Sequence, residues 1–96
     1  MKASEYVKQG WCQGVDAKDS TGEKVEVDDP RAVRWCVAGA MQAARCTVED
    51  ELALAAFIGF TPSVRSADRY WSLTVWNDRW GRTQQEVVDA LEANGL

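Results

Sequence analysis

Histidine is absent from this chain of 96 residues. Because histidine is the usual general base of hydrolases and a frequent zinc ligand, its absence excludes Ser-His-Asp and Cys-His catalysis and every zinc site that uses an imidazole. Carboxylate and lysine chemistry stay open. We therefore expect a protein that is not an enzyme and that carries no metal and no other cofactor.

Cysteine pairs and long apolar runs are also missing. Cys12, Cys36 and Cys46 form an odd number without the spacing of a disulfide framework or a thiolate zinc site, so we expect buried, free thiols. No apolar stretch approaches the roughly 18 residues that a membrane span needs. No apolar run follows Lys2, as it would in a secretory signal. These absences predict a cytoplasmic protein without membrane contact.

An excess of basic residues is missing too. The chain has 15 acidic and 11 basic residues and a net charge of −4, so it lacks the basic surface typical of nucleic-acid binding. Lysines and arginines interrupt the acids almost everywhere, which also disfavours an acidic mimic of nucleic acid. Direct nucleic-acid binding is therefore not expected, and mimicry ranks last among the candidate functions.

The N-terminal part of the chain combines one helix signal with one strand signal. Residues 2–9 predict a short helix with Ser4 as its N-cap and Gly10 as its stop. Residues 23–27 alternate polar and apolar side chains, as a half-buried strand does, and turn-forming residues at 19–22 precede them. We expect a small β-hairpin here, which must lie on the helices to be stable.

The strongest helix signal in the sequence is Asp29-Pro30, with Asp as N-cap and Pro at the first helical position. An apolar stripe with a strip of very small side chains beside it follows as far as Arg45 or Cys46. Small side chains let another backbone approach closely, so this segment is expected to be the central helix.

Two further helices begin at threonine caps. Thr47 precedes three acidic residues of a first turn, and Thr83 forms a capping box with Glu86. Residues 66–73 fit a short helix and an extended segment equally well. The prediction is a mainly α, compact four- to five-helix single domain over residues 1–96, with a small β-hairpin near the N-terminus.

One predicted loop, residues 70–83, stands out. It holds three of the five tryptophans together with an Asn-Asp pair and two arginines. Tryptophan and arginine are enriched at binding hot spots. The candidate partner-binding residues are therefore Trp71, Trp76, Asn77, Asp78, Arg79, Trp80 and Arg82.

The same loop also has a purely structural interpretation. Asn77 and Asp78 can fold back onto nearby backbone as Asx turns, and Gly81 can supply a positive φ before the Thr83 cap. Tryptophans can also simply fill the core of a small domain. We favour the structural interpretation for Asn77 and Asp78, and weigh the two equally for Arg79 and Arg82.

Several short segments together carry a family resemblance. They are Gly10-Trp11-Cys12-Gln13, Asp29-Pro30, Arg34-Trp35-Cys36 with Gly39-Ala40, Trp76-Asn77-Asp78, Gly81-Arg82-Thr83 and Glu86-Val87. In this order they resemble a small family of uncharacterised bacterial and phage proteins, a domain of unknown function. The resemblance implies one compact domain and marks Asn77-Asp78 and Gly81-Arg82-Thr83 as signature positions. It implies no activity, and Trp71 and Trp80 depart from the family's pattern.

Three hypotheses for the function follow. The first is a small protein-binding accessory factor of bacterial or phage origin, for example a phage-encoded inhibitor of a host system, whose aromatic and arginine side chains are exposed. The alternative is a small-ligand binder or carboxylate-dependent enzyme in which Asp78 acts as base and Arg82 holds an anion. An acidic nucleic-acid mimic is the third. Both a monomer and a homodimer are compatible with the sequence.

Overall fold

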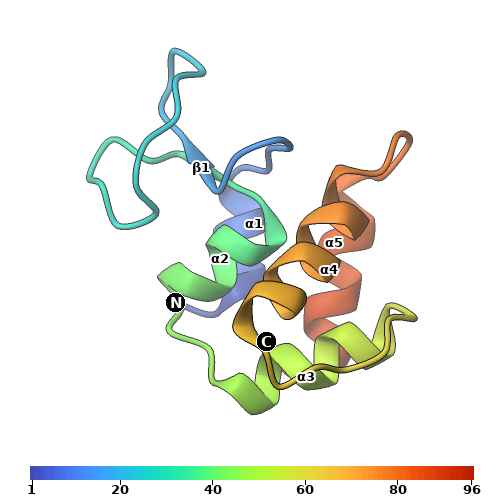
Figure 1. Cartoon of the computed structure of the whole chain (residues 1–96). Coiled ribbons are helices and arrows are strands. Elements are labelled where there is room, and N and C mark those ends of the chain that lie inside the picture. The colour runs from blue at the N-terminus through green and yellow to red at the C-terminus, as the bar shows by residue number, and fades with distance from the viewer.

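Five helices and one two-stranded antiparallel sheet make up the computed structural model, which describes all 96 residues (Figure 1). In chain order the elements are α1 Ala3–Gln9, β1 Ala17–Lys18, β2 Arg34–Trp35, α2 Val37–Ala43, α3 Val48–Phe57, α4 Ser66–Asp78 and α5 Gln84–Ala93. This confirms the predicted class, a mainly α fold with a small β element. None of the five helices is long and apolar enough to cross a membrane.

The two threonine caps are confirmed. Thr47 Oγ1 accepts a hydrogen bond from the backbone N–H of Asp50 at 3.2 Å, and α3 begins at the next residue. Thr83 Oγ1 accepts from the N–H of Glu86 at 3.1 Å at the start of α5. Both motifs depend on residues three positions apart, so the local sequence is sufficient to define them.

The first helix, predicted over residues 2–9, is confirmed as Ala3–Gln9, but Ser4 as its N-cap was wrong. The N-cap is Lys2, whose backbone N–H donates to Glu5 Oε1 at 3.0 Å. Ser4 lies inside the helix and is only 3% exposed. Its backbone N–H donates to the carbonyl of Leu96 at 3.1 Å, because α1 packs against the end of the last helix.

The central helix is much shorter than predicted, and its start at Asp29-Pro30 was wrong. Asp29 does accept a hydrogen bond from the N–H of Arg31 at 2.8 Å, but only a turn follows. Trp35 is extended instead, and its N–H donates to the carbonyl of Gly10 at 3.1 Å. The helix begins at Val37 because strand pairing with distant residues overrides the local signal.

The β-hairpin is present, but its second strand is β2 rather than residues 23–27. Ala17 pairs with Trp35 and Lys18 with Arg34, whereas Lys24 contributes only an isolated bridge to Lys18. The predicted turn at 19–22 is confirmed. Its first carboxylate, Asp19 Oδ1, accepts from the N–H groups of Thr21 and Glu23, and the hydroxyl and backbone donors at Thr21 and Glu23 lower the pKa of that carboxyl.

The core lies where α1 packs on α2 and α5, and where α4 packs on α2 and α3. Its fully buried apolar side chains come from all of these helices: Val7, Val37, Leu54, Leu73, Val87 and Leu91. One face of α4 contributes to this core, and the opposite face is at the surface.

Helix α2 ends in a Schellman motif whose left-handed residue is not glycine. The N–H of Cys46 donates to the carbonyl of Met41 at 3.0 Å, and the N–H of Arg45 to that of Gln42 at 3.0 Å. Arg45 occupies this position with φ +57°, the one positive φ outside glycine in the chain. Glycine has no Cβ penalty in this conformation and is strongly preferred there.

We therefore expect Arg45→Gly to stabilise the protein. Relief of the left-handed backbone outweighs the extra chain entropy of glycine, so the free energy of unfolding should rise by about 0.5–1 kcal/mol. Urea unfolding measures this directly. Gly59→Ala is the matched control, since Gly59 has φ +97° and no atom near its Cβ position, and it should lower stability. A loss of stability in Arg45→Gly would show that the arginine side chain makes a stabilising contact.

Candidate functional site

The predicted site residues lie on α4 and on the short loop after it. The expectation of a loop over residues 70–83 was wrong for its first part, because α4 continues to Asp78. Only residues 79–83 connect α4 to α5, with Gly81 at the predicted positive φ of 84°. Asn77 and Asp78 do not form Asx turns. Their side chains bond to residues 11–14 and to Val37, and not to the nearby backbone of α4, so the helix continues through both positions.

Asn77 is the centre of a buried hydrogen-bond network. It is 0% exposed, and its Oδ1 accepts from Trp11 Nε1 at 2.8 Å and from the backbone N–H of Val37 at 2.9 Å. Its Nδ2 donates to the carbonyl of Cys12 at 3.1 Å and to Asp78 Oδ1 at 2.9 Å. An amide offers two donors and two acceptor positions, so this side chain is fully satisfied. It joins α4 to α2 and to the segment after α1.

That segment, residues 11–14, also binds the last turn of α4. Asp78 Oδ1 accepts from the N–H of Gly14 at 3.0 Å. Gln13 Nε2 donates to the carbonyl of Asn77 at 2.9 Å and to that of Arg79 at 3.3 Å. Helix C-termini leave carbonyl groups without partners, and Gln13 supplies donors for two of them. Trp11 and Gln13 were not predicted as partners, although both belong to the first segment of the family resemblance.

Arg82 closes the other side of this helix end. Its guanidinium lies 4.1 Å from the centroid of the Trp76 ring, a cation–π geometry, and its Nε donates to the carbonyl of Trp76 at 2.9 Å. Its Nη1 pairs with Glu86 at 2.8 Å. The hydrogen bonds from Arg82 and Thr83 hold the pKa of the Glu86 carboxyl below its usual value. The Arg82 side chain is only 12% exposed and serves the fold.

Asp78 and Arg82 therefore do not converge on a common pocket. Asp78 bonds to Gly14 and Asn77, and Arg82 bonds to Trp76 and Glu86. The structure has three clefts, and no predicted site residue lines any of them. This arrangement removes the geometric support for an enzyme or ligand binder that uses Asp78 with Arg82.

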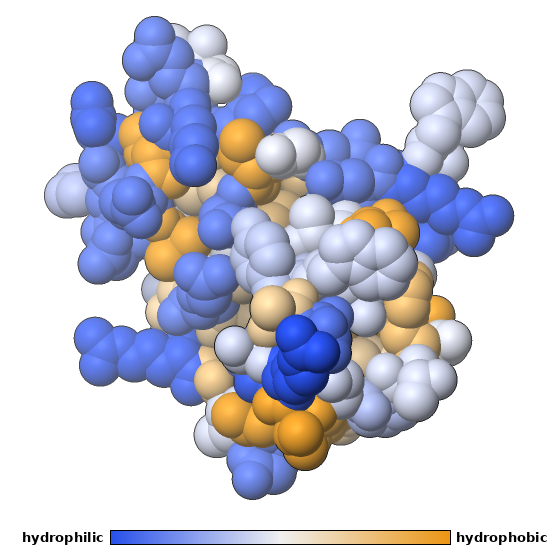
Figure 2. Space-filling model, in the orientation of Figure 1, coloured by the Kyte–Doolittle hydropathy of each residue, from blue (hydrophilic) through white to orange (hydrophobic).

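The remaining predicted residues are at the surface. Trp80 is 97% exposed, Trp71 is 60% exposed, and Arg79 is exposed between them in sequence. Trp71 and Val75 are four residues apart and therefore lie on the same side of α4. Arg79, four residues after Val75, is the first residue of the loop. Figure 2 shows pale surfaces, the colour of residues of intermediate hydropathy, over α4 and at the tip of the α4–α5 loop. We call Trp71, Val75, Arg79 and Trp80 the aromatic face.

A family model described as a family of unknown function, DUF6197, matches residues 1–94. The chain belongs to this family. The resemblance to an uncharacterised domain family is thereby confirmed. A search of curated proteins found no match, and neither did a search of solved structures.

The structure explains how the segments of the resemblance fit together in this DUF6197 member. The first of them, Gly10-Trp11-Cys12-Gln13, supplies four contacts with Asn77 or Arg79. Gly81-Arg82-Thr83 and Glu86 close the helix end from the other side. Trp71 and Trp80, which depart from the family's pattern, take no part in these contacts and are exposed. The network thus stabilises the fold, and the aromatic face takes no part in it.

The N-terminal side of α4 is fixed by Arg69, a buried arginine. Its Nε pairs with Glu51 of α3 at 2.9 Å, and its Nη1 donates to the carbonyls of Ser63 and Val64. Trp71 packs edge-on against Phe60, with ring centroids 6.1 Å apart. The helix that carries the aromatic face is therefore held at both of its ends.

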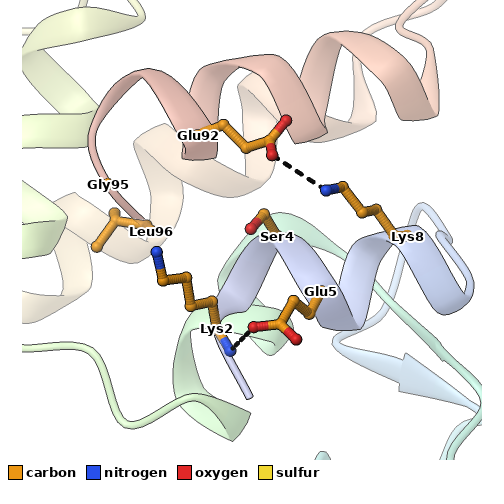
Figure 3. A pocket seen from close by; sticks show the side chains of 7 residues that line it. All are labelled: Lys2, Ser4, Glu5, Lys8, Glu92, Gly95 and Leu96. Carbon is orange, nitrogen blue, oxygen red and sulfur yellow. Dashed lines mark hydrogen bonds and ion pairs between the residues drawn. The ribbon is translucent and has the colours of Figure 1, made fainter.

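One of the three clefts, of about 320 Å³, lies between α1 and the end of α5 (Figure 3). Lys8 and Glu92 face each other there and form an ion pair at 3.0 Å. Glu5 accepts from the backbone N–H of Lys2. Two of the four charged side chains of this cleft are thus paired with each other, and Glu5 is bound to the backbone, so we assign the cleft no ligand.

The cysteines behave mostly as small core side chains. Cys12 and Cys36 are buried and Cys46 is half-buried, all as free thiols. Burial raises the pKa of the Cys36 thiol to about 12, and its Sγ accepts from the N–H of Gly39 as the N-cap of α2. Burial also raises the pKa of Cys12. Neither thiol is a ready nucleophile at neutral pH, because the thiolate is the reactive form.

Proposed function

We propose that this DUF6197 member is a small protein-binding accessory factor whose contact surface is the aromatic face. The observation that carries this proposal is the exposure of Trp80, which is 97% accessible at the tip of the α4–α5 loop. Burying a large apolar side chain in a partner contributes about 1.5–3 kcal/mol to binding. Tryptophan is also among the residues most enriched at hot spots.

The loop that carries Trp80 is held in place before any partner arrives. The N–H of Arg82 donates to the carbonyl of Arg79 at 3.0 Å across the loop, and Gln13 donates to the same carbonyl. A surface that is already ordered loses less conformational entropy on binding than a flexible one. The order of this loop therefore favours a role in recognition over that of a simple connection between α4 and α5.

The predicted site residues then divide into two groups. Trp71, Arg79 and Trp80 would touch the partner, with the arginine favouring an acidic rim around an apolar pocket. Trp76, Asn77, Asp78 and Arg82 would hold the helix end and the loop in position. The resemblance to bacterial and phage proteins makes a host protein the first partner class to test.

The decisive experiment is affinity capture from a bacterial lysate followed by a binding measurement on the captured protein. Trp80→Ala and Arg79→Glu should each weaken the Kd, Trp80→Ala by about thirty-fold or more, as a hot-spot residue does. Val33→Ala is the matched control, because Val33 is an exposed apolar residue outside the face. All three variants should keep the wild-type melting temperature.

Two outcomes speak against the proposal. A partner that binds wild type, Trp80→Ala and Arg79→Glu equally well does not use this face. Failure of every form to retain a stoichiometric partner removes the support for a binding factor in the lysate tested.

A further inference from the structure

A second cleft, of about 590 Å³, opens between α1, residues 26–28 and the end of α2. Its size is within the range of about 300–1,000 Å³ that is typical of small-molecule sites. The apolar part of its lining includes Tyr6 and Val27, and the polar part is Glu26, Asp28, Gln42 and Arg45. In Figure 1 the end of α2 lies far from the α4–α5 loop, so this cleft is separate from the aromatic face.

The charged side chains of this cleft have no ionic partner in the chain. Glu26, Asp28 and Arg45 take no part in any of the five ion pairs. The two carboxylates and the guanidinium therefore line one cleft at distances too long for an ion pair. By contrast, Glu51, Glu86 and Glu92 are each paired with a basic side chain.

Arg45, which lines this cleft, has an unfavourable backbone conformation. Its φ of +57° is in the left-handed region that glycine favours. Residues held in such conformations concentrate at functional sites, where the side chain is needed. Together with the cleft and its unpaired charges, the left-handed backbone of Arg45 supports a role for the guanidinium.

We propose that this cleft binds a dipolar organic cation of the kind represented by a basic amino acid. The cationic end would pair with Glu26 and Asp28, and the carboxylate of the ligand with the guanidinium of Arg45. Its extended, partly apolar stem would lie along Tyr6, whose ring is fixed edge-on against Trp35 with centroids 5.0 Å apart.

The arrangement of charges selects this class of ligand. A simple cation would leave Arg45 without a partner, and a simple anion would be repelled by two carboxylates. A ligand with separated charges can pair with the carboxylates and with the guanidinium. A free amino acid and the C-terminal arginine of a peptide share this chemistry.

The test is an NMR titration of the ¹⁵N-labelled protein with L-arginine into the millimolar range. Saturable shifts should centre on residues 26–28 and 42–45. Agmatine, which has the guanidinium but lacks the carboxylate, should bind about ten-fold more weakly, as expected for the loss of one charge-assisted hydrogen bond. Acetyl-Ala-Ala-Arg distinguishes the sources: binding as tight as that of L-arginine indicates a peptide terminus, and weaker binding a free amino acid.

Variants test the guanidinium and the two carboxylates of the cleft separately. Arg45→Gln should bring L-arginine down to the affinity of agmatine, whereas Asp28→Asn and Glu26→Gln should weaken both probes. Glu49→Gln is the control, because Glu49 is an exposed acid of α3 outside the cleft. All four positions are exposed, so circular dichroism should show unchanged folding.

Three results would overturn the proposal. The first is the lack of saturable shifts with L-arginine. The second is equal affinity of the wild type for L-arginine and agmatine, and the third is an unchanged affinity of Asp28→Asn and Glu26→Gln. None of these results bears on the aromatic face, so this site and the proposed function stand or fall separately.

Discussion

Asn77→Asp is expected to destabilise the protein by about 3–5 kcal/mol at neutral pH, the usual penalty for an unpaired buried charge. The substitution hardly changes the size of the side chain, so the effect reports on hydrogen bonding and charge alone. The introduced carboxylate has no N–H to donate to the carbonyl of Cys12 or to Asp78 Oδ1. It places a second negative charge beside Asp78 in a position with no solvent access.

The destabilisation should depend on pH in a defined direction. Burial and the nearby carboxylate of Asp78 raise the pKa of the introduced carboxyl in the folded state above the unfolded value of about 3.9. The folded state then binds the proton more tightly than the unfolded state, so the free energy of unfolding rises as the pH falls through this pKa. The penalty should be full at pH values above the folded pKa and largely gone near pH 4.

Urea unfolding of the variant and the wild type between pH 7 and pH 4 measures this effect. Asn94→Asp is the matched control, because Asn94 is the only other asparagine and lies half-buried at the end of α5, where its Nδ2 donates to Ala90. It should cost less than about 1 kcal/mol, since its charge remains hydrated near a helix end. Equal effects of the two substitutions, or a penalty without pH dependence, would contradict the central role of Asn77.

Local signals in the sequence predicted helix starts well where the partners are a few residues apart. The caps at Thr47 and Thr83 depend on residues three positions away, and both are present. Asp29-Pro30 carries an equally good local signal, and Asp29 does accept from the N–H of Arg31. The helix fails there because Trp35 bonds to Gly10, a partner 25 residues earlier that no local pattern reveals.

Part of the candidate site is exposed, and this part was singled out by composition rather than by a local pattern. Its richness in tryptophan and arginine is a property of composition, so it pointed to the exposed side chains of Trp71, Arg79 and Trp80. The role of Asn77 depends on Trp11 and Cys12, more than 60 positions away in the chain. Such pairings need the three-dimensional fold, and the sequence alone supported the wrong local alternative of an Asx turn.

Gly39→Ala is expected to have the second large effect. It should lower the free energy of unfolding, although helix propensity alone would raise it. Alanine is about 1 kcal/mol more favourable than glycine inside a helix. The added Cβ, however, would lie 2.0 Å from the carbonyl oxygen of Asp16 and 2.8 Å from its carbon. These are backbone atoms, and the same oxygen accepts the N–H of Cys36 at 3.1 Å. The strip of small residues thus serves the close backbone approach that the sequence predicted.

The net result should be a loss of about 3 kcal/mol, as for an overpacked core, measured by urea or thermal unfolding. Gly22→Ala is the control: its Cβ position is open and its φ is +89°, so it should cost about 1 kcal/mol from the backbone alone. Gly10→Ala, whose Cβ would lie 2.2 Å from the carbonyl oxygen of Val33, should resemble Gly39→Ala. If Gly39→Ala instead stabilises the protein, α2 can move away from Asp16. The hydrogen bond from the N–H of Val37 to Asn77 would then have to adjust, and the position of the α4 end would depend less on α2 than the structure implies.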